Sequence, residues 1–156
     1  MYYDKTRIDN IGTLTVSGTT ELVWAPGQAV KVKRVIMHTS TAVTVADATV
    51  SVKVRDLDGT PTATKGSFVV PFTGSAIDDT LFADIAANQT GPTTAADGST
   101  VYAGGAGEIA VGQGEEFVLV SDGGSTAGAV TVYVEYVPEG FNGVDGVGTK
   151  LTYTTA

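Results

Sequence analysis

The stretch GAVTVYVEYVPEG, Gly128 to Gly140, decides the fold class of this chain. With the two-residue period of a β-strand, one face carries Val130, Val132, Val134 and Tyr136, and the other carries Thr131, Tyr133, Glu135 and Val137. The first face is typical of a hydrophobic core. The second face is too apolar for open water and too polar for a dry interior, so we expect it to form a semi-polar, wet contact with another subunit.

The same period recurs along the chain between clusters of Gly, Asp, Ser and Asn, which is the pattern of an all-β protein with two packed antiparallel sheets. We therefore predict eight or nine strands and one domain spanning residues 1–156. Besides the opening stretch, the strong strand candidates are Ala29–Thr39, Thr49–Leu57 and Glu115–Asp122, and the weaker ones are Arg7–Val16, Glu21–Trp24, Ser67–Phe72, Glu108–Val111 and Thr149–Tyr153.

Two local features depart from regular strands. Val32 and Val35 fall on opposite parities of one apolar strand, and a β-bulge near Lys33 and Arg34 would restore the register. The segment Ser75–Asn88 predicts a short helix inside the long excursion from residue 72 to residue 100. It offers a serine N-cap, acids in the first turn and apolar residues on one helical face, which are Ser75, Asp78, Asp79, Leu81, Phe82 and Ile85.

Composition limits the classes of function. The chain has 156 residues, no cysteine and a net charge of −8. Because nonspecific affinity for nucleic acid comes from lysine and arginine at phosphates, this charge argues against a nucleic-acid partner. The N-terminus lacks the apolar run of a signal peptide or membrane helix, so we expect synthesis in a cytoplasm and no membrane partner.

Charge is unevenly divided along the chain. Residues 1–65 hold eight basic and six acidic side chains, a net of +2, whereas residues 66–156 hold one lysine and eleven acids, a net of −10. We expect the two halves to attract each other, within one subunit or between neighbours.

No residue pattern indicates an enzyme, a cofactor or a metal site. The only histidine, His38, has no nucleophile signature to serve, and it is expected to be a partly buried strand residue. The segment Asp56–Thr60 starts like a calcium loop but lacks the later carboxylates, so a hairpin turn is preferred.

Two sets of residues are candidate interaction surfaces. Lys31, Lys33, Lys53 and Arg55 would form a basic stripe if their strands pair, as a solvated face or as a surface for acidic partners. An N-terminal arm of about residues 1–6, extended to Arg7, offers Tyr2, Tyr3 and Lys5, as interface anchors or as a disordered end. A glycine-rich C-terminal segment covers about residues 138–149.

The run GEIAVGQGEEFVLVSDGGSTAGAVTVYVEYVPEG, Gly107 to Gly140, resembles the closing strands of capsid decoration (cement) proteins of tailed bacteriophages, which are small β-sandwich proteins of the virion. The resemblance covers about a fifth of the chain and lies in composition and strand order. It implies a single jelly-roll-like antiparallel β-sandwich and a homotrimer on the outer capsid surface that bridges neighbouring major capsid proteins. It implies no catalytic residue and no cofactor.

The sequence thus predicts a structural virion protein that cements a phage capsid. We expect the basic stripe and the N-terminal arm to contact neighbours or capsid, Tyr133 and Glu135 to lie at a subunit contact, and the acidic half to face solvent. The alternative is a module of a phage tail or fibre that binds host glycans, for which Trp24 and the tyrosines would supply aromatic platforms.

Overall fold

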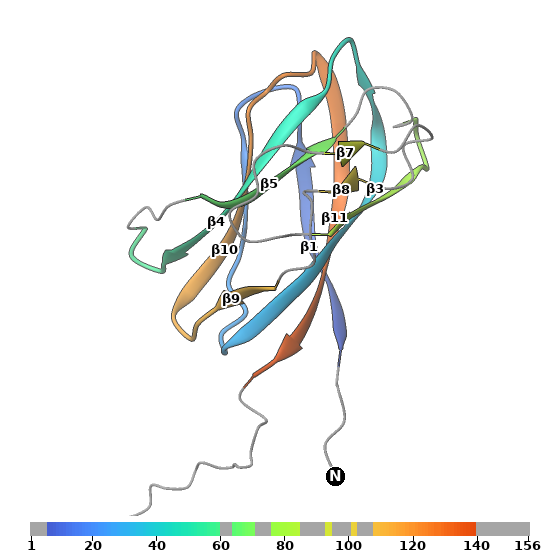
Figure 1. Cartoon of the computed structure of the whole chain (residues 1–156). Helices are drawn as coiled ribbons and strands as arrows, with labels where there is room; N and C mark the ends of the chain where they lie inside the picture. The colour runs from blue at the N-terminus through green and yellow to red at the C-terminus, as the bar shows by residue number, and fades with distance from the viewer. Residues whose placement is uncertain are drawn as a thin grey trace, which may run out of the picture.

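The computed structural model describes residues 6–59, 64–70, 76–84, 93–94, 101–102 and 108–139. In this part the chain is all-β and forms two sheets (Figure 1), as the alternation of apolar residues predicts. The predicted strand Thr149–Tyr153, the arm of residues 1–5 and all but the start of the glycine-rich segment lie outside the described residues.

The larger sheet has the strand order β1-β11-β3-β6-β8-β7, with β9 also paired to β3. The smaller sheet has the order β2-β10-β4-β5. Pairing is antiparallel throughout except between β6 and β8. The strands are β1 (Arg7–Thr15), β2 (Glu21–Trp24), β3 (Val30–Thr44), β4 (Ala48–Asp56), β5 (Thr64–Val70), β6 (Thr80–Asp84), β7 (Thr93–Thr94), β8 (Val101–Tyr102), β9 (Ile109–Val111), β10 (Glu115–Ser121) and β11 (Ala127–Pro138).

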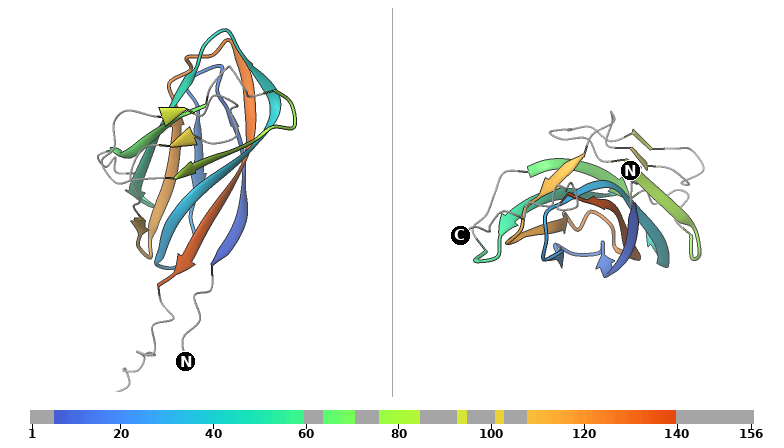
Figure 2. Two further views of the ribbon diagram at one scale, coloured as in Figure 1. Left: turned by 45° about the vertical axis from the view of Figure 1, so that its right-hand side comes forward. Right: turned by 90° about the horizontal axis from the view of Figure 1, so that it is seen from below.

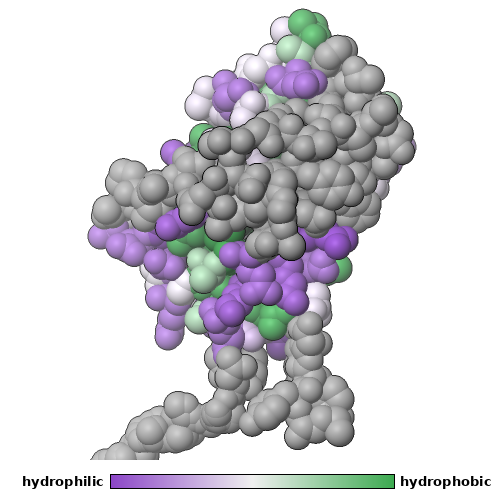
Figure 3. All heavy atoms as spheres, in the orientation of Figure 1, coloured by the Kyte–Doolittle hydropathy of each residue, from purple (hydrophilic) through white to green (hydrophobic). Residues whose placement is uncertain are grey.

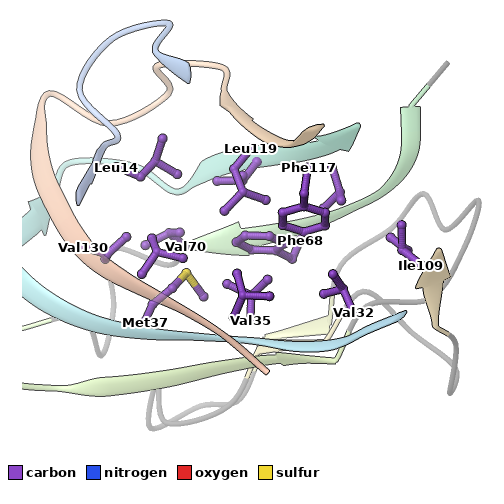
Figure 4. Close-up of a cluster of buried hydrophobic side chains, with 14 of the residues drawn as sticks. Leu14, Val32, Val35, Met37, Phe68, Val70, Ile109, Phe117, Leu119 and Val130 are labelled. Carbon is purple, nitrogen blue, oxygen red and sulfur yellow. The ribbon is translucent and has the colours of Figure 1, made fainter. Parts of the chain in front are cut away.

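One hydrophobic core lies between the sheets (Figure 4). Strands β1, β3, β4, β5, β9, β10 and β11 contribute side chains to it, and Leu22 and Trp24 of β2 pack against it. Phe68 of β5 and Phe117 of β10 are its largest fully buried members. The inward face of β11 is buried from Val130 to Tyr136, which confirms the strand face predicted from the opening stretch. Burial of this apolar surface is the main favourable term in folding.

The predicted bulge in β3 is confirmed. Glu135 of β11 pairs with Arg34, and the next residue, Tyr136, pairs with Val32, so Lys33 is the extra residue on the β3 side. The bulge keeps valines on both sides of it in the core, because Val32 and Val35 are both 0 % exposed.

Three connections cross between the sheets at one end of the molecule, the upper end in Figure 1 and in the left view of Figure 2. They are residues 16–20 from β1 to β2, residues 45–47 from β3 to β4, and residues 122–126 from β10 to β11. Backbone hydrogen bonds tie these connections to neighbouring strand ends, among them Thr126 N to Thr44 O at 3.3 Å and Ser121 N to Thr20 O at 2.9 Å. We name this end the crossover end.

The helix predicted for Ser75–Asn88 is wrong where the segment is described. Residues 76–79 form a turn and Thr80–Asp84 is strand β6, paired with β3. Asp78 N donates to Thr39 O at 2.9 Å, and Thr39 N donates to Asp79 O at 2.8 Å. The free edge of β3 offers these hydrogen bonds, and Asp78 leaves the helical region with a φ of 74°. Tertiary pairing therefore overrides the local helix signals.

Candidate interaction surface

The basic stripe predicted from Lys31, Lys33, Lys53 and Arg55 does not form. Lys31 and Lys33 lie in β3 of the larger sheet, whereas Lys53 and Arg55 lie in β4 of the smaller sheet. The two strands follow each other in sequence, but the connection at residues 45–47 crosses between sheets, so they do not pair. The condition for the stripe, that the two strands pair, is therefore not met.

The lysines of β3 are engaged in ion pairs. Lys31 Nζ lies 3.7 Å from a carboxylate oxygen of Glu108 and 3.6 Å from one of Glu139, and Lys33 Nζ lies 3.9 Å from Glu108. All four side chains are about one third to one half exposed, so each pair adds little stability. The pairs nonetheless confirm that the basic first half of the chain attracts the acidic second half within one subunit.

Arg55 is held more tightly, on the outer face of the smaller sheet. Its Nε donates to Glu116 Oε2 at 2.8 Å and its Nη1 to Glu21 Oε2 at 3.1 Å. The hydrogen bond to Glu116, followed by the charge and hydrogen bond of Glu21, raises the pKa of the Arg55 guanidinium despite an opposing desolvation effect. Glu116 opposes Arg55 across the β10–β4 pair, whereas Glu21 pairs with Val120 further along β10.

The Arg55 side chain therefore spans the position of Val118 to reach Glu21. Val118 points outward, because its neighbours Phe117 and Leu119 belong to the core, yet it is only 1 % exposed. Val23 and Lys53 flank Val118 on the neighbouring strands, and the hydrogen bonds of Arg55 to Glu116 and Glu21 hold the arginine beside them, where its long stem is suited to cover apolar surface. Arg55 is thus part of the fold rather than a free cation, whereas Lys53 makes no ion pair with any described residue.

The outer face of the larger sheet carries the side of β11 that we expect to contact another subunit. Tyr133 pairs with Asn10 of β1 on one side and with Ile36 of β3 on the other, and Glu135 pairs in the same way with Ile8 and Arg34. We name this surface the Tyr133 face. Its members are Ile8, Asn10 and Thr13 of β1, Thr131, Tyr133 and Glu135 of β11, and Arg34, Ile36 and His38 of β3.

The Tyr133 face combines apolar groups with a balanced ion pair. Ile8 is 56 % exposed, and Tyr133 and Ile36 are half-buried. Glu135 Oε1 lies 3.5 Å from Nε of Arg34. Glu135 is the one carboxylate and Arg34 the one guanidinium among the residues of this face. Their charges cancel, so these nine residues together are close to neutral, although Asp84 of β6 pairs with Arg34 on the next strand and the chain as a whole carries −8.

His38 makes an ion-pair contact and no described catalytic arrangement. Its Nε2 lies 3.4 Å from Oδ1 of Asp78, and its side chain is 42 % exposed. His38 is thus a partly buried residue of strand β3, as expected. In the described ranges, no three His, Asp or Glu side chains are placed to hold a metal ion. None of the described residues forms a helix long and apolar enough to cross a bilayer.

A cluster that the sequence did not indicate lies where β1 and β2 border the core. Trp24 packs on Tyr136 with ring centroids 4.9 Å apart and meets Phe117 edge-on at 6.4 Å. The Tyr136 hydroxyl donates to Asp9 Oδ2 at 2.8 Å, which ties the first half of β1 to β11. Strand parity alone places Tyr136 inward, but the match between its hydroxyl and Asp9 depends on the β1–β11 register.

This tyrosine makes stability depend on pH in the alkaline range. Burial, and then the hydrogen bond to Asp9, raises the pKa of Tyr136 above its usual value of about 10. The folded state therefore holds the phenol proton more tightly than the unfolded state does. This contribution is fully present below pH of about 10 and is lost as the pH rises through the folded pKa.

We expect Tyr136→Phe to flatten the alkaline loss of stability. At pH 7 the variant loses the hydrogen bond to Asp9, about 1–2 kcal/mol of unfolding free energy. Between pH 9 and pH 11 its stability should fall less steeply than that of the wild type, as measured by urea unfolding. Tyr133→Phe is the matched control, because it removes a phenol and leaves the Tyr136–Asp9 bond in place. Parallel pH profiles for the wild type and Tyr136→Phe would contradict the assignment.

Of the remaining predicted residues, Tyr2, Tyr3 and Lys5 lie outside the described residues, and Arg7 is the exposed first residue of β1. Comparisons with protein-family models, curated proteins and solved structures find no match to this chain. The resemblance to phage decoration proteins therefore stays a prediction from the sequence.

Proposed function

We propose that this chain is a structural protein of a tailed-bacteriophage virion. It assembles as a homotrimer, binds the outer surface of the capsid and cements neighbouring major capsid proteins. Its two sheets are then those of a jelly-roll-like β-sandwich. The observation that carries the proposal is the Tyr133 face, a near-neutral and partly apolar surface on a strongly acidic chain.

Charge is the first argument for self-association through this face. Two copies of a chain with net charge −8 repel each other over most of their surface. Because Arg34 and Glu135 neutralise each other, contact through the Tyr133 face adds little repulsion between copies. Like charges facing each other would oppose any other register.

The side chains of the face are also suited to a subunit contact. Tyr133 presents a large amphipathic ring with few rotatable bonds, so its burial costs little side-chain entropy. Ile8 adds apolar area at the edge of the face, and Thr13 and Thr131 add hydroxyls able to bind bridging water. An interface of this kind has an apolar centre and a wet polar rim.

A cement protein works by repetition of modest contacts. Each copy in a trimer raises the effective concentration of the others at the shell, so weak individual sites give strong overall binding. Such a mechanism needs a rigid scaffold with several surfaces and no reacting group. The present fold offers it in two sheets joined by one core.

Tyr133→Lys is expected to dissociate the trimer. A lysine in the centre of the interface brings three unpaired charges together, and loss of a central aromatic typically costs 2 kcal/mol or more, about 30-fold in the dissociation constant. Sedimentation equilibrium over a range of concentrations measures the subunit number. Val23→Lys, which adds the same charge on the outer face of the smaller sheet, is the control and should stay trimeric.

The wild-type result tests the proposal directly. A monomer at every concentration, together with no binding to stripped capsids, would refute it. A trimer that survives Tyr133→Lys as well as it survives Val23→Lys would locate the subunit contact elsewhere on the molecule.

The rival proposal of a glycan-binding module loses its best aromatic platform. Sugar sites stack a ligand on an open aromatic face, whereas Trp24 packs against Tyr136 and Phe117 of its own chain. Saturable binding on a glycan array without capsid binding would nevertheless reverse the order of the two proposals.

A further inference from the structure

Val45 is an anomaly at the crossover end. It is the first residue of the connection between β3 and β4, its φ is 78°, and its side chain is 71 % exposed. Figure 3 shows hydrophobic atoms at the top of the molecule, over this connection. A β-branched residue in the left-handed region is a genuine outlier, because its branched Cβ crowds the backbone.

In the described part of the chain, no side-chain contact of Val45 offsets the strain of this conformation. A strained φ persists where contacts of the side chain offset it, but the Val45 side chain is the most open of the large apolar side chains that the structure describes. The turn itself needs a positive φ, which glycine or asparagine supplies at lower cost. A contact outside the described part of the chain would account for the choice of valine.

The residues on both sides of Val45 are held firmly. Thr44 N donates to Ser125 Oγ at 3.2 Å, and Ser125 Oγ donates to Thr44 O at 2.8 Å. On the other side, Thr49 N donates to Asp122 Oδ1 at 3.0 Å, and Asp122 N donates back to Thr49 O at 2.9 Å. The connection is thus anchored at both ends on residues 122–126, and Val45 is presented as a rigid apolar knob. Preorganisation of this kind lowers the entropy cost of docking.

The charged residues around Val45 indicate the kind of partner that this end of the molecule fits. The three connections at this end, residues 16–20, 45–47 and 122–126, contain Asp47 and Asp122 and no lysine or arginine. An acidic rim around an apolar knob fits a protein pocket lined by apolar groups and bordered by lysine or arginine. A second copy of this chain is less suitable, since its net charge of −8 repels an acidic rim and four of its basic side chains, Lys31, Lys33, Arg34 and Arg55, are already in ion pairs.

We infer that the crossover end is the surface that meets the capsid shell, with Val45 inserted in an apolar pocket of the major capsid protein whose border carries basic side chains. This inference rests on the proposed function and names the part of the molecule that performs the attachment. It reverses the expectation that the acidic part of the chain faces solvent. The Tyr133 face remains available for contacts between copies.

The test uses shells assembled from the major capsid protein of the phage that encodes this chain, and measures binding of the full-length protein by cosedimentation. Val45→Asn removes the apolar knob and keeps the positive φ, so the dissociation constant per copy should rise about 10- to 100-fold. The same variant should unfold about 2–4 °C higher, because the backbone strain is relieved. Val45→Ile, which keeps the knob, should bind as the wild type does.

Leu57→Asn is the matched control, because Leu57 is 58 % exposed in the turn after β4, at the far end of that strand from Val45. It should leave shell binding unchanged. Asp47→Asn should weaken binding and reduce its dependence on salt concentration.

The outcomes separate the two proposals. No binding of the wild type to shells overturns the proposed function and this inference together. Wild-type binding that Val45→Asn leaves unchanged, or that Leu57→Asn weakens equally, overturns the inference alone. A lower unfolding temperature for Val45→Asn also overturns it, since valine would then be kept for the fold. Loss of self-association in Val45→Asn with shell binding intact would assign the knob to a second copy.

Discussion

Gly128→Ala is expected to lower the free energy of unfolding by about 2–4 kcal/mol. Gly128 is the second residue of β11, next to the connection from β10, and its φ is 142°. A Cβ at this position would lie 2.7 Å from Val16 Cγ2 and 3.0 Å from the Val43 Cα. Because the Val43 Cα belongs to the backbone of β3, the clash is not relieved by a rotamer change, and the crossover end must open.

Gly18→Ala is the matched control for this prediction. Gly18 lies in the connection from β1 to β2 at the same end, and a Cβ there meets no atom within 4 Å. Urea unfolding of the two variants should therefore differ by several kcal/mol, with Gly18→Ala within about 0.5 kcal/mol of the wild type. Similar losses in the two variants would show that the end tolerates both and that the close packing is not needed for stability.

The strands were predictable because each is specified by its own local alternation. In β11 the apolar residues follow the two-residue period from Val130 to Tyr136 without interruption, and a slip of one residue would expose the whole set. The bulge at Lys33 was predictable for the same reason, since the parity of valines must change when an extra residue is inserted. Such signals need no knowledge of the rest of the chain.

The assignment of strands to sheets was not predictable in this way. The connection at residues 45–47 is short enough for a hairpin, and nothing in its residues shows that it crosses between sheets. The ion partners of Lys31 and Arg55 depend on the sheet to which each strand belongs. The basic stripe does not form because these two residues lie in different sheets. The helix prediction failed for a related reason, because the free edge of β3 that captures Thr80–Asp84 exists only after the sheet has formed.

The residues of the candidate site also fall into two groups, those whose position the sequence predicts and those whose position depends on how the strands pair. The outward position of Tyr133 and Glu135 followed from parity, whereas their neighbours Ile8, Ile36 and Arg34 required the register of three strands. Val45 carries no sequence signal at all. A valine between threonine and alanine reads as ordinary strand, and only the backbone angle shows that it is strained.

Phe117→Ala is expected to have the largest effect on stability, a loss of about 3–5 kcal/mol in unfolding free energy. Phe117 is 0 % exposed, and its strand β10 lies between β2 and β4 at the centre of the smaller sheet. Its ring meets Trp24 edge-on, so its removal takes away both buried apolar area and an aromatic contact. Because β-sheet backbones on both sides fix the position, the cavity collapses only in part.

The single tryptophan makes this prediction easy to follow, since Trp24 fluorescence reports on the side chain that Phe117 contacts. Phe117→Leu keeps most of the volume and should lose about 1–1.5 kcal/mol, and Val120→Ala, on the outward side of β10, less than about 1 kcal/mol. Phe117 lies in the core and not on the Tyr133 face, so the folded fraction of Phe117→Ala should keep the subunit number of the wild type. A loss below about 1 kcal/mol, or dissociation of a protein that is still folded, would contradict the separation between the core that holds the two sheets together and the face proposed to join the subunits.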